Sequence, residues 1–297
     1  MGFVKRDFHL DEGVKVLNFL VTNLGIRLRD AKRMIDRGRV AINGERLYLK
    51  GYKTEKESIL TCLVFEANGI GIKPFFENED FAVFDKPSGV VIHPQGLNSC
   101  QTLLDDVRNL YGNDANLVHR IDKETSGIVI ASKNKYSEHI LKRMFEDRLV
   151  SKSYLALVEG IIDKKIVIDK PIATNKNQDI KVKSIISEDG KESITEIEPI
   201  KTFGDKTLVK ATPITGRTHQ IRVHLFSIGH RIVGDPIYGV DFDVADRYLS
   251  NNLETEERIL KTGADRLALH AFKIEFSYRN RKYVLKKDID FYNILKY

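Results

Sequence analysis

The first helical pattern in the chain lies within residues 13–24. Its apolar side chains recur with the period of an α-helix, at Val16, Leu17, Leu20 and Leu24. This spacing places them on one face, so the pattern predicts a short helix that buries that face against the rest of its domain.

A second helical pattern begins at about Arg27 and ends at Gly38, a residue type that is common just after a helix. One face is apolar and is predicted to pack inward, with Leu28, Ala31 and Ile35. Residues 27–39 also hold six basic side chains against two acidic ones, the basic ones being Arg27, Arg29, Lys32, Arg33, Arg37 and Arg39. Such a ridge is either a solvated helix face or a surface that binds nucleic-acid phosphates. The basic stripe alone favours the first of these interpretations.

The next stretch, residues 39–46, predicts a β-hairpin. Its Asn43–Gly44 pair is the dipeptide most typical of a tight hairpin turn. Residues 67–75 contain glycine and proline and predict a linker. We therefore expect a first domain at residues 10–66 and a second at residues 76–297.

The second domain alternates short apolar runs with occasional helical patterns, which is typical of an α+β fold. The predicted strands are Phe81–Lys86, Val90–Pro94 after a turn, Ser153–Val158, Leu267–Ala271 and Phe272–Phe276. The predicted helices are one through Ile140–Phe145 and one that Thr218 caps and Gly229 ends. Residues 241–262 are charged and are predicted to form a peripheral helical insertion.

Composition narrows the class of protein. With 297 residues, 42% of them hydrophobic and 30% charged, the chain can form two unequal globular domains. No apolar run reaches the roughly 18 residues that a membrane-spanning helix needs, and no secretory signal is evident, so we expect a cytoplasmic protein with no membrane partner. The two cysteines, Cys62 and Cys100, lack metal-ligand spacing and are expected to stay reduced. A net charge of +6 and a pI of about 9.0 favour a polyanionic partner.

Two motifs carry the candidate chemistry. Residues 119–127 read His-Arg-Ile-Asp-Lys-Glu-Thr-Ser-Gly and precede a buried apolar run, which places Asp122 in a turn before a core strand. Residues 215–224 read Thr-Gly-Arg-Thr-His-Gln-Ile-Arg-Val-His, and the stretch Ile-Gly-His-Arg-Ile-Val-Gly-Asp follows at residues 228–235. A single aspartate in a turn is usually only a turn or cap residue, so a wider pattern must decide its role.

Further blocks accompany these motifs in order, at Asp85–Pro94, Lys152–Gly160, Gly190–Lys191 with Thr195, and Arg266–Ala271. Together they resemble the RluA-type pseudouridine synthase family, including its RluC-like and RluD-like members, over about residues 75–297. Ile121 and Ser193 stand where that family often has leucine and alanine. Residues 10–66 resemble the small RNA-binding domain named after ribosomal protein S-four. This resemblance implies that the six basic side chains of residues 27–39 bind RNA.

The resemblance implies a fold, an activity and a partner. We expect an α+β catalytic domain with a mixed, largely antiparallel sheet and flanking helices, beside a small N-terminal α/β RNA-binding domain. The implied reaction is isomerisation of uridine to pseudouridine in structured RNA, with 23S ribosomal RNA as the expected substrate and tRNA as the alternative. The reaction involves no redox change, so no cofactor and no metal are expected, and we expect a monomer.

The resemblance also assigns roles to individual residues. Asp122 is expected to react, either by adding to the substrate or by taking a sugar proton. Arg217 is expected to form its ion pair, and Tyr154 to stack on the flipped uracil. Arg120 matches the residue that fills the space left by the flipped base. Leu267 and Leu269 are expected to line the uracil pocket, and Lys86 and Arg222 to contact phosphates. His119 is expected either to contact the substrate or to hold its turn by hydrogen bonds.

Three other interpretations stay open. A glycosidase would break the same bond, but it needs two flanking carboxylates, and Glu124 lies only two residues from Asp122. A methyltransferase would need a glycine-rich nucleotide loop, which the sequence lacks. A non-catalytic RNA-binding or ribosome-assembly protein would not need Asp122, Tyr154 and Arg217 together. His219 and His224 are five residues apart, which does not suit a metal site.

Overall fold

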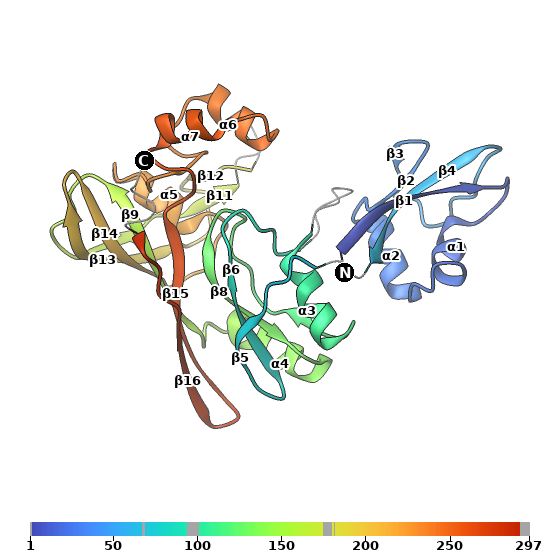
Figure 1. The fold of residues 1–297 in the computed structure, drawn as a ribbon, viewed down its shortest axis with the longest axis horizontal. Helices are drawn as coiled ribbons and strands as arrows, with labels where there is room; N and C mark the ends of the chain where they lie inside the picture. Colours follow the sequence, from blue (N-terminus) through green and yellow to red (C-terminus); the bar gives the residue numbers. More distant parts are fainter. Residues whose placement is uncertain (1, 67–68, 94–100, 175–179, 181, 292–297) are drawn as a thin grey trace. The chain divides into compact units, whose positions relative to one another are not determined.

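The computed structural model describes residues 2–66, 69–93, 101–174, 180 and 182–291 of the chain. The chain divides into two compact units, which Figure 1 colours along the sequence. Unit 1 comprises residues 1–73 and 91–115, and unit 2 comprises residues 74–90 and 116–297. The functional division into an RNA-binding domain, a linker and a catalytic domain stays a prediction.

Unit 1 contains a four-stranded antiparallel sheet and helices that bury their apolar faces. The strands follow the order β1 (Gly2–Leu10), β4 (Ser58–Glu66), β2 (Val40–Ile42) and β3 (Glu45–Arg46). The helices are α1 (Val16–Thr22), α2 (Leu28–Asp36) and α3 (Leu103–Tyr111). Leu20, Ile35 and Leu60 are fully buried in one core cluster, which joins both N-terminal helices to the sheet.

The local predictions for this unit are confirmed with two differences. Both helices form, and Asn43 and Gly44 have φ angles of 50° and 85°, as a tight hairpin turn between β2 and β3 requires. Leu28 was predicted to pack inward, but it is 50% exposed because it is the first residue of α2 and precedes the buried face that starts at Ala31. Strand β1 was not predicted, because its partner β4 lies some fifty residues away in the sequence.

Unit 2 is built on one ten-stranded sheet within the described residues. Its main path is β10 (Ile166–Asp169), β13 (Ile194–Phe203), β14 (Lys206–Pro213), β9 (Ser151–Glu159), β15 (Leu269–Tyr278), β8 (Ser126–Ser132), β6 (Phe81–Lys86) and β5 (Pro74–Glu77). In addition, β16 (Arg281–Lys286) pairs with β15, and β7 (Asn116–Leu117) pairs with β8. The pair β15–β8 is parallel and the other described pairs are antiparallel. The predicted α+β class with a mixed, largely antiparallel sheet is confirmed.

Helices flank this sheet and complete the unit. They are α4 (Lys135–Glu146), α5 (Gln220–Phe226), α6 (Phe242–Leu249) and α7 (Thr255–Thr262). A small two-stranded sheet of β11 (Ile172–Thr174) and β12 (Ser184–Ile186) contacts α5 through β12. One core cluster contains Phe81, Ile130, Leu141 and Phe276, so it joins β6, β8, α4 and β15. No helix among the described residues has the length and apolar character to cross a membrane.

Several predicted elements of unit 2 differ in detail. Val91 forms only an isolated bridge with Thr102, so the part of Val90–Pro94 that the structure describes is no strand, and Pro94 lies outside the described residues. The two predicted late strands are one strand, β15, that starts at Leu269. The N-cap residue of α5 is His219 instead of Thr218, because the helix begins one residue later than the pattern indicated.

This architecture brings three segments to one place. The loop before β8 carries Asp122, and β8 itself is buried along its whole length. Two strands away, β9 carries Tyr154. The segment that enters α5 carries the second motif.

Candidate active site

A cleft in unit 2 gathers most of the residues that the sequence analysis selected. It encloses about 570 Å³, which lies within the roughly 300–1,000 Å³ of pockets that bind small ligands. Its lining includes Asp122, Tyr154, Arg217, Arg120, His119, Arg222 and Leu269. The two motifs, some ninety residues apart in the sequence, therefore form one site.

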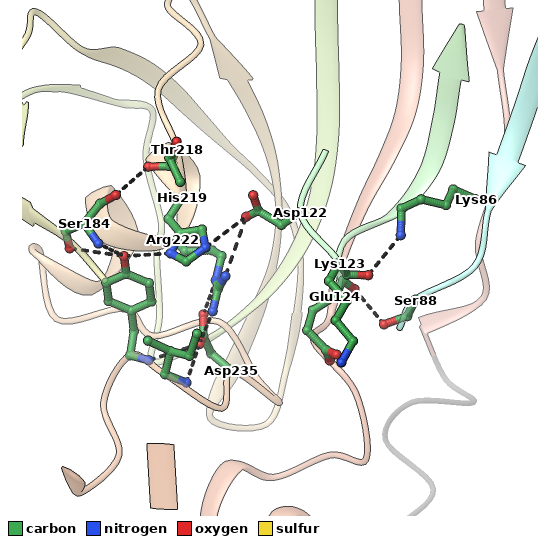
Figure 2. Close-up of polar contacts among 12 residues, drawn as sticks. Lys86, Ser88, Asp122, Lys123, Glu124, Ser184, Thr218, His219, Arg222 and Asp235 are labelled. Atoms are coloured by element: carbon green, nitrogen blue, oxygen red, sulfur yellow. Dashed lines mark hydrogen bonds and ion pairs between the residues drawn. The ribbon is translucent and has the colours of Figure 1, made fainter. Parts of the chain in front are cut away.

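Asp122 lies at the centre of a polar network in this cleft (Figure 2). Its side chain is 20% exposed, so a substrate can reach the carboxylate. Arg222 Nη1 lies 3.5 Å from Asp122 Oδ2, and His219 Nε2 lies 3.9 Å from the same oxygen. The partly buried carboxylate is therefore compensated by a guanidinium, as an ionised acid in a cleft requires.

Arg222 is held in place by a second carboxylate, Asp235. Its Nε and Nη2 both donate to Asp235 at 2.7 Å, and the side chains are 2% and 1% exposed. The backbone N–H groups of Ile237 and Tyr238 also donate to Asp235 Oδ1. Burial alone would raise the pKa of Asp235, but Arg222 and these donors lower it, so the pair stays ionised. This bidentate contact fixes the guanidinium beside Asp122.

The ion pair that was predicted for Arg217 is made by Arg222. Arg217 also lines the cleft, but its Nε donates to the carbonyl of Glu192 at 3.1 Å. Arg217 precedes α5, whereas Arg222 lies inside the helix on the side that meets Asp122 and Asp235. Arg222 was also predicted to contact a phosphate. This prediction is wrong, because its guanidinium is buried between the carboxylates of Asp122 and Asp235.

His219 and Tyr238 form the wall behind Arg222. His219 has a φ of 55°, a left-handed conformation that turns its ring inward, and its Nδ1 lies 3.1 Å from the Tyr238 hydroxyl. Burial and the charge of Arg222 lower the pKa of His219 to about 4, so the ring is neutral at pH 7. The Tyr238 ring lies 5.1 Å from the Arg222 guanidinium carbon, a cation–π contact that further supports the arginine.

Tyr154 contributes an aromatic surface to the cleft. It is 9% exposed, and β9 places it between β14 and β15, opposite Ala211 and Ala271. Burial and the charge of Asp122 raise the pKa of its hydroxyl well above the ordinary value, so the phenol stays protonated at neutral pH. A protonated phenol cannot accept a proton, so the raised pKa favours stacking over proton abstraction. Leu269 lines the cleft with it, whereas Leu267 is fully buried and does not belong to the described lining.

Arg120 and His119 lie on the same loop but in different environments. Arg120 is exposed at the cleft, where it can meet RNA. His119 stacks on Phe145 with ring centroids 4.4 Å apart, and its Nε2 accepts a hydrogen bond from the Ile130 N–H at 3.0 Å. Burial and the nearby charge of Lys152 lower the pKa of His119 to about 3. His119 is thus a neutral ring that anchors the loop to β8.

Lys86 was predicted to contact phosphate, and the structure contradicts this. Its side chain is fully buried, and Nζ donates to the carbonyls of Pro87, Val90 and Lys123 at 2.8–2.9 Å. All three ammonium protons are therefore bound inside the protein, as Figure 2 shows for Lys123. Burial lowers the pKa of Lys86 to about 7. Lys86 supports the backbone next to Asp122 instead of binding RNA.

Several residues of this network were missed by the sequence analysis. Asp235 ends the stretch 228–235 and no role was predicted for it, although an arginine between Ile221 and Val223 on a buried helix indicates a carboxylate partner. Lys152 also lines the cleft, two residues before Tyr154 on β9, and burial lowers the pKa of its ammonium. No local signal in the sequence pointed to Tyr238, whose role depends on the tertiary fold.

The basic face of α2 lies in unit 1. Its side chains Arg29, Lys32, Arg33 and Arg37 are exposed. Arg27 is bound to Asp30 at 2.9 Å but keeps 65% of its side chain exposed, and Arg39 is half-buried. The predicted basic surface is therefore present on the helix.

The described residues contain no cluster of three or more side chains suited to hold a metal ion. Cys62 is a buried free thiol, and burial raises its pKa to about 12. Cys100 lies outside the described residues.

Comparisons with known proteins agree on one family. Residues 80–227 match the family model described as RNA pseudouridylate synthase. An RNA pseudouridine synthase of Helicobacter pylori strain J99 is 39% identical over 95% of this chain and 94% of its own length. The ribosomal large subunit pseudouridine synthase C of Pasteurella multocida strain Pm70 is 31% identical over 90% of this chain and 84% of its own length.

A solved structure supports the same relationship. Human RNA pseudouridylate synthase domain containing 1 superimposes with a TM-score of 0.61 and 27% identity, and it covers 76% of this chain and 86% of that one. The polar cleft around Asp122 thus lies in a fold that the human protein shares. The chain belongs to the RNA pseudouridine synthase family, whose members isomerise uridine in RNA.

Proposed function

We propose that this protein converts uridine to pseudouridine in large-subunit ribosomal RNA, in the cytoplasm and as a monomer. The observation that carries the proposal is the charge-compensated carboxylate of Asp122 in a cleft of nucleotide size. The substrate class is supported by the similarity to the ribosomal large subunit pseudouridine synthase C of Pasteurella multocida. A net charge of +6 also suits a large polyanionic substrate.

The reaction requires one bond to break and one to form. The bond between N1 of uracil and C1′ of ribose breaks, uracil turns, and a bond forms between C5 and C1′. C5 then loses its proton and N1 gains one, so atoms and electrons balance without a cofactor. Asp122 serves either as the nucleophile at C1′ or as the base that removes the C2′ proton. Arg222 Nη1, 3.5 Å from Asp122 Oδ2, places a positive charge beside the reacting carboxylate in either role.

The base must leave its helix before it can react, at a cost of a few kcal/mol. Arg120, exposed at the cleft, fills the space that the base leaves, since a planar cation can stack and bind phosphate together. Inside the cleft, the Tyr154 ring stacks on uracil and Leu269 packs beside it. Arg217, at the entrance to α5 and half-exposed, binds the neighbouring phosphate in place of the buried Arg222.

The first domain, residues 10–66, acts as an S-four-type RNA-binding module. Exposed basic side chains lie on α2 and at its two ends, and the half-buried Arg39 follows them; they are Arg29, Lys32 and Arg33 on the helix and Arg27 and Arg37 at its ends. Such contacts depend on counterion release and carry no sequence information. The module therefore raises affinity for structured RNA, and the cleft selects the uridine.

The experiment compares total RNA from a deletion strain with RNA from its parent, by mapping pseudouridines that react with carbodiimide. We expect one or more large-subunit rRNA positions to lose the signal. Wild-type protein should restore it, and the Asp122→Asn variant should not. Loss of signal only in tRNA would replace the rRNA assignment, and unchanged RNA would contradict the proposed function.

A further inference from the structure

Helix α7 reaches the loop that carries Asp122. Nη2 of Arg258, on this helix, lies 2.6 Å from Oε2 of Glu124, which follows Asp122 by two residues. The Arg258 and Glu124 side chains are 12% and 8% exposed. The segment that was predicted to be peripheral therefore makes a buried ion pair beside the reacting carboxylate.

The same helix holds the loop that carries Asp235. The N–H of Gly234 donates to the carbonyl of Thr262 at 2.8 Å, and the carbonyl of Gly234 accepts from Arg258 Nη2 at 3.0 Å. Gly234 has a φ of 78°, and a Cβ there would collide with the carbonyl of Arg266, so only glycine fits. Helix α7 thus binds both the N–H and the carbonyl of Gly234, the residue before Asp235.

These contacts close a ring around the active site. The backbone connects Asp122 to Glu124 and Gly234 to Asp235. Side-chain contacts connect Asp122 to Arg222, Arg222 to Asp235, and Arg258 to both Gly234 and Glu124. The ring runs through Asp122, Arg222, Asp235, Gly234, Arg258 and Glu124. Asp122 and Arg222 belong to the described lining of the cleft, whereas Arg258 does not.

Tyr248 on α6 strengthens this connection. Its ring lies 5.4 Å from the Arg258 guanidinium carbon, and its hydroxyl hydrogen-bonds Glu124. Burial would raise the pKa of Glu124, but the charge and hydrogen bond of Arg258, with the Tyr248 hydroxyl, lower it. Glu124 is therefore ionised at neutral pH, and the ion pair is present under working conditions.

We propose that Arg258 is a positioning residue that holds the loops of Asp122 and Asp235 at the separation which keeps Asp122 against Arg222. The inference rests on the proposed role of Asp122 in the reaction. Arg258 does not touch substrate, so its effect acts through geometry. A displacement of about 1 Å at a reacting group can slow a reaction by roughly 100-fold.

The test measures the single-turnover rate at which the Arg258→Met variant forms pseudouridine. The substrate is total RNA from the deletion strain, and the enzyme is in excess over the RNA. We expect a rate roughly 100-fold below wild type, with the Kd for RNA unchanged. The matched control is Arg247→Met. Arg247 binds Glu257 at 2.6 Å and joins α6 to α7, but it lies outside the ring. This variant should loosen the same insertion and keep the wild-type rate.

A second variant separates positioning from folding. Glu124→Gln combined with Arg258→Met leaves no unpaired buried charge and keeps an acceptor for Tyr248, so its Tm should recover relative to Arg258→Met. Its rate should stay low. The positioning role is overturned if the rate recovers with Tm, or if Arg258→Met reacts as fast as Arg247→Met. If Arg258→Met does not fold, the double variant decides alone. If wild-type protein forms no pseudouridine in any RNA, the proposed function itself fails.

Discussion

The basic face of α2 and the charged network of the cleft use the same residue types in opposite environments. On α2 the side chains of Arg29, Lys32 and Arg33 are exposed. In the cleft, Arg222 is 2% exposed and lies between two carboxylates. The first surface can change without consequence for the fold, whereas Arg222 and Asp235 each depend on the other for charge compensation.

Because of this difference in burial, the exposed charges of α2 should affect RNA binding, and the buried charges of the cleft should affect the reaction. Exposed cations bind a polyanion through long-range attraction that salt screens. Buried pairs are screened much less, and removing one partner leaves an uncompensated charge. Substitutions on α2 should therefore act on RNA affinity alone, and substitutions in the buried pair of Arg222 and Asp235 on both stability and turnover.

The largest effect is expected for Arg222→Met. It leaves Asp235 buried without its partner, and breaking a buried pair costs about 3–5 kcal/mol of unfolding free energy. Asp122 also loses its cation, so turnover should fall with stability. Urea unfolding and single-turnover assays measure the two effects.

Arg217→Met is the matched control for that variant, from the same motif. Its side chain is half-exposed and donates to a backbone carbonyl, so the free energy of unfolding should change by less than about 1 kcal/mol. Equal losses of stability in the two variants would contradict the assignment of Arg222 as the structural partner.

A smaller effect is expected in the pH dependence of stability. Burial lowers the pKa of Lys86 to about 7 in the folded protein, against about 10.4 in an unfolded chain. Between these values the unfolded state binds more protons, so stability due to this group rises with pH. Relative to Lys86→Met, wild type should gain up to about 1.4 kcal/mol per pH unit in that window. Parallel stability curves for the two proteins would show that Lys86 keeps an ordinary pKa.

The smallest effect on the fold is expected on α2. Changing Arg29, Lys32 and Arg33 together to glutamine should alter unfolding free energy by less than about 0.5 kcal/mol per site. RNA binding should weaken, and the slope of log K against log salt should flatten by about 2 to 3. Lys164, Lys165 and Lys261, exposed in unit 2, serve as control positions. An unchanged slope would remove α2 from the RNA interface.

Local patterns in the sequence predicted much of the fold. The Asn43–Gly44 turn, the helix through Ile140–Phe145 and the strand Phe81–Lys86 depend on neighbouring residues, and all three are confirmed. Strand β1 depends on pairing with β4, a distant partner that its own residues do not indicate.

The site was predicted less completely, because burial decides the role of a charge. Arg217 and Arg222 lie in one motif, and which of them meets Asp122 depends on α5 starting at Gln220. Lys86 lies beside a Pro-Ser-Gly turn that is typical of a surface, yet its ammonium is enclosed by carbonyls. Arg258 comes from a charged segment with no motif, and its contact with Glu124 depends on the tertiary fold.

The most direct test of the account uses purified wild-type protein and Asp122→Asn on ribosomal RNA from the deletion strain. Mass spectrometry of the RNA nucleosides follows pseudouridine and free uracil, and a binding assay follows Kd. Wild type should form pseudouridine without releasing uracil, and Asp122→Asn should bind the RNA with the same Kd and form none. Pseudouridine formation by Asp122→Asn would contradict the claim that this carboxylate performs the reaction.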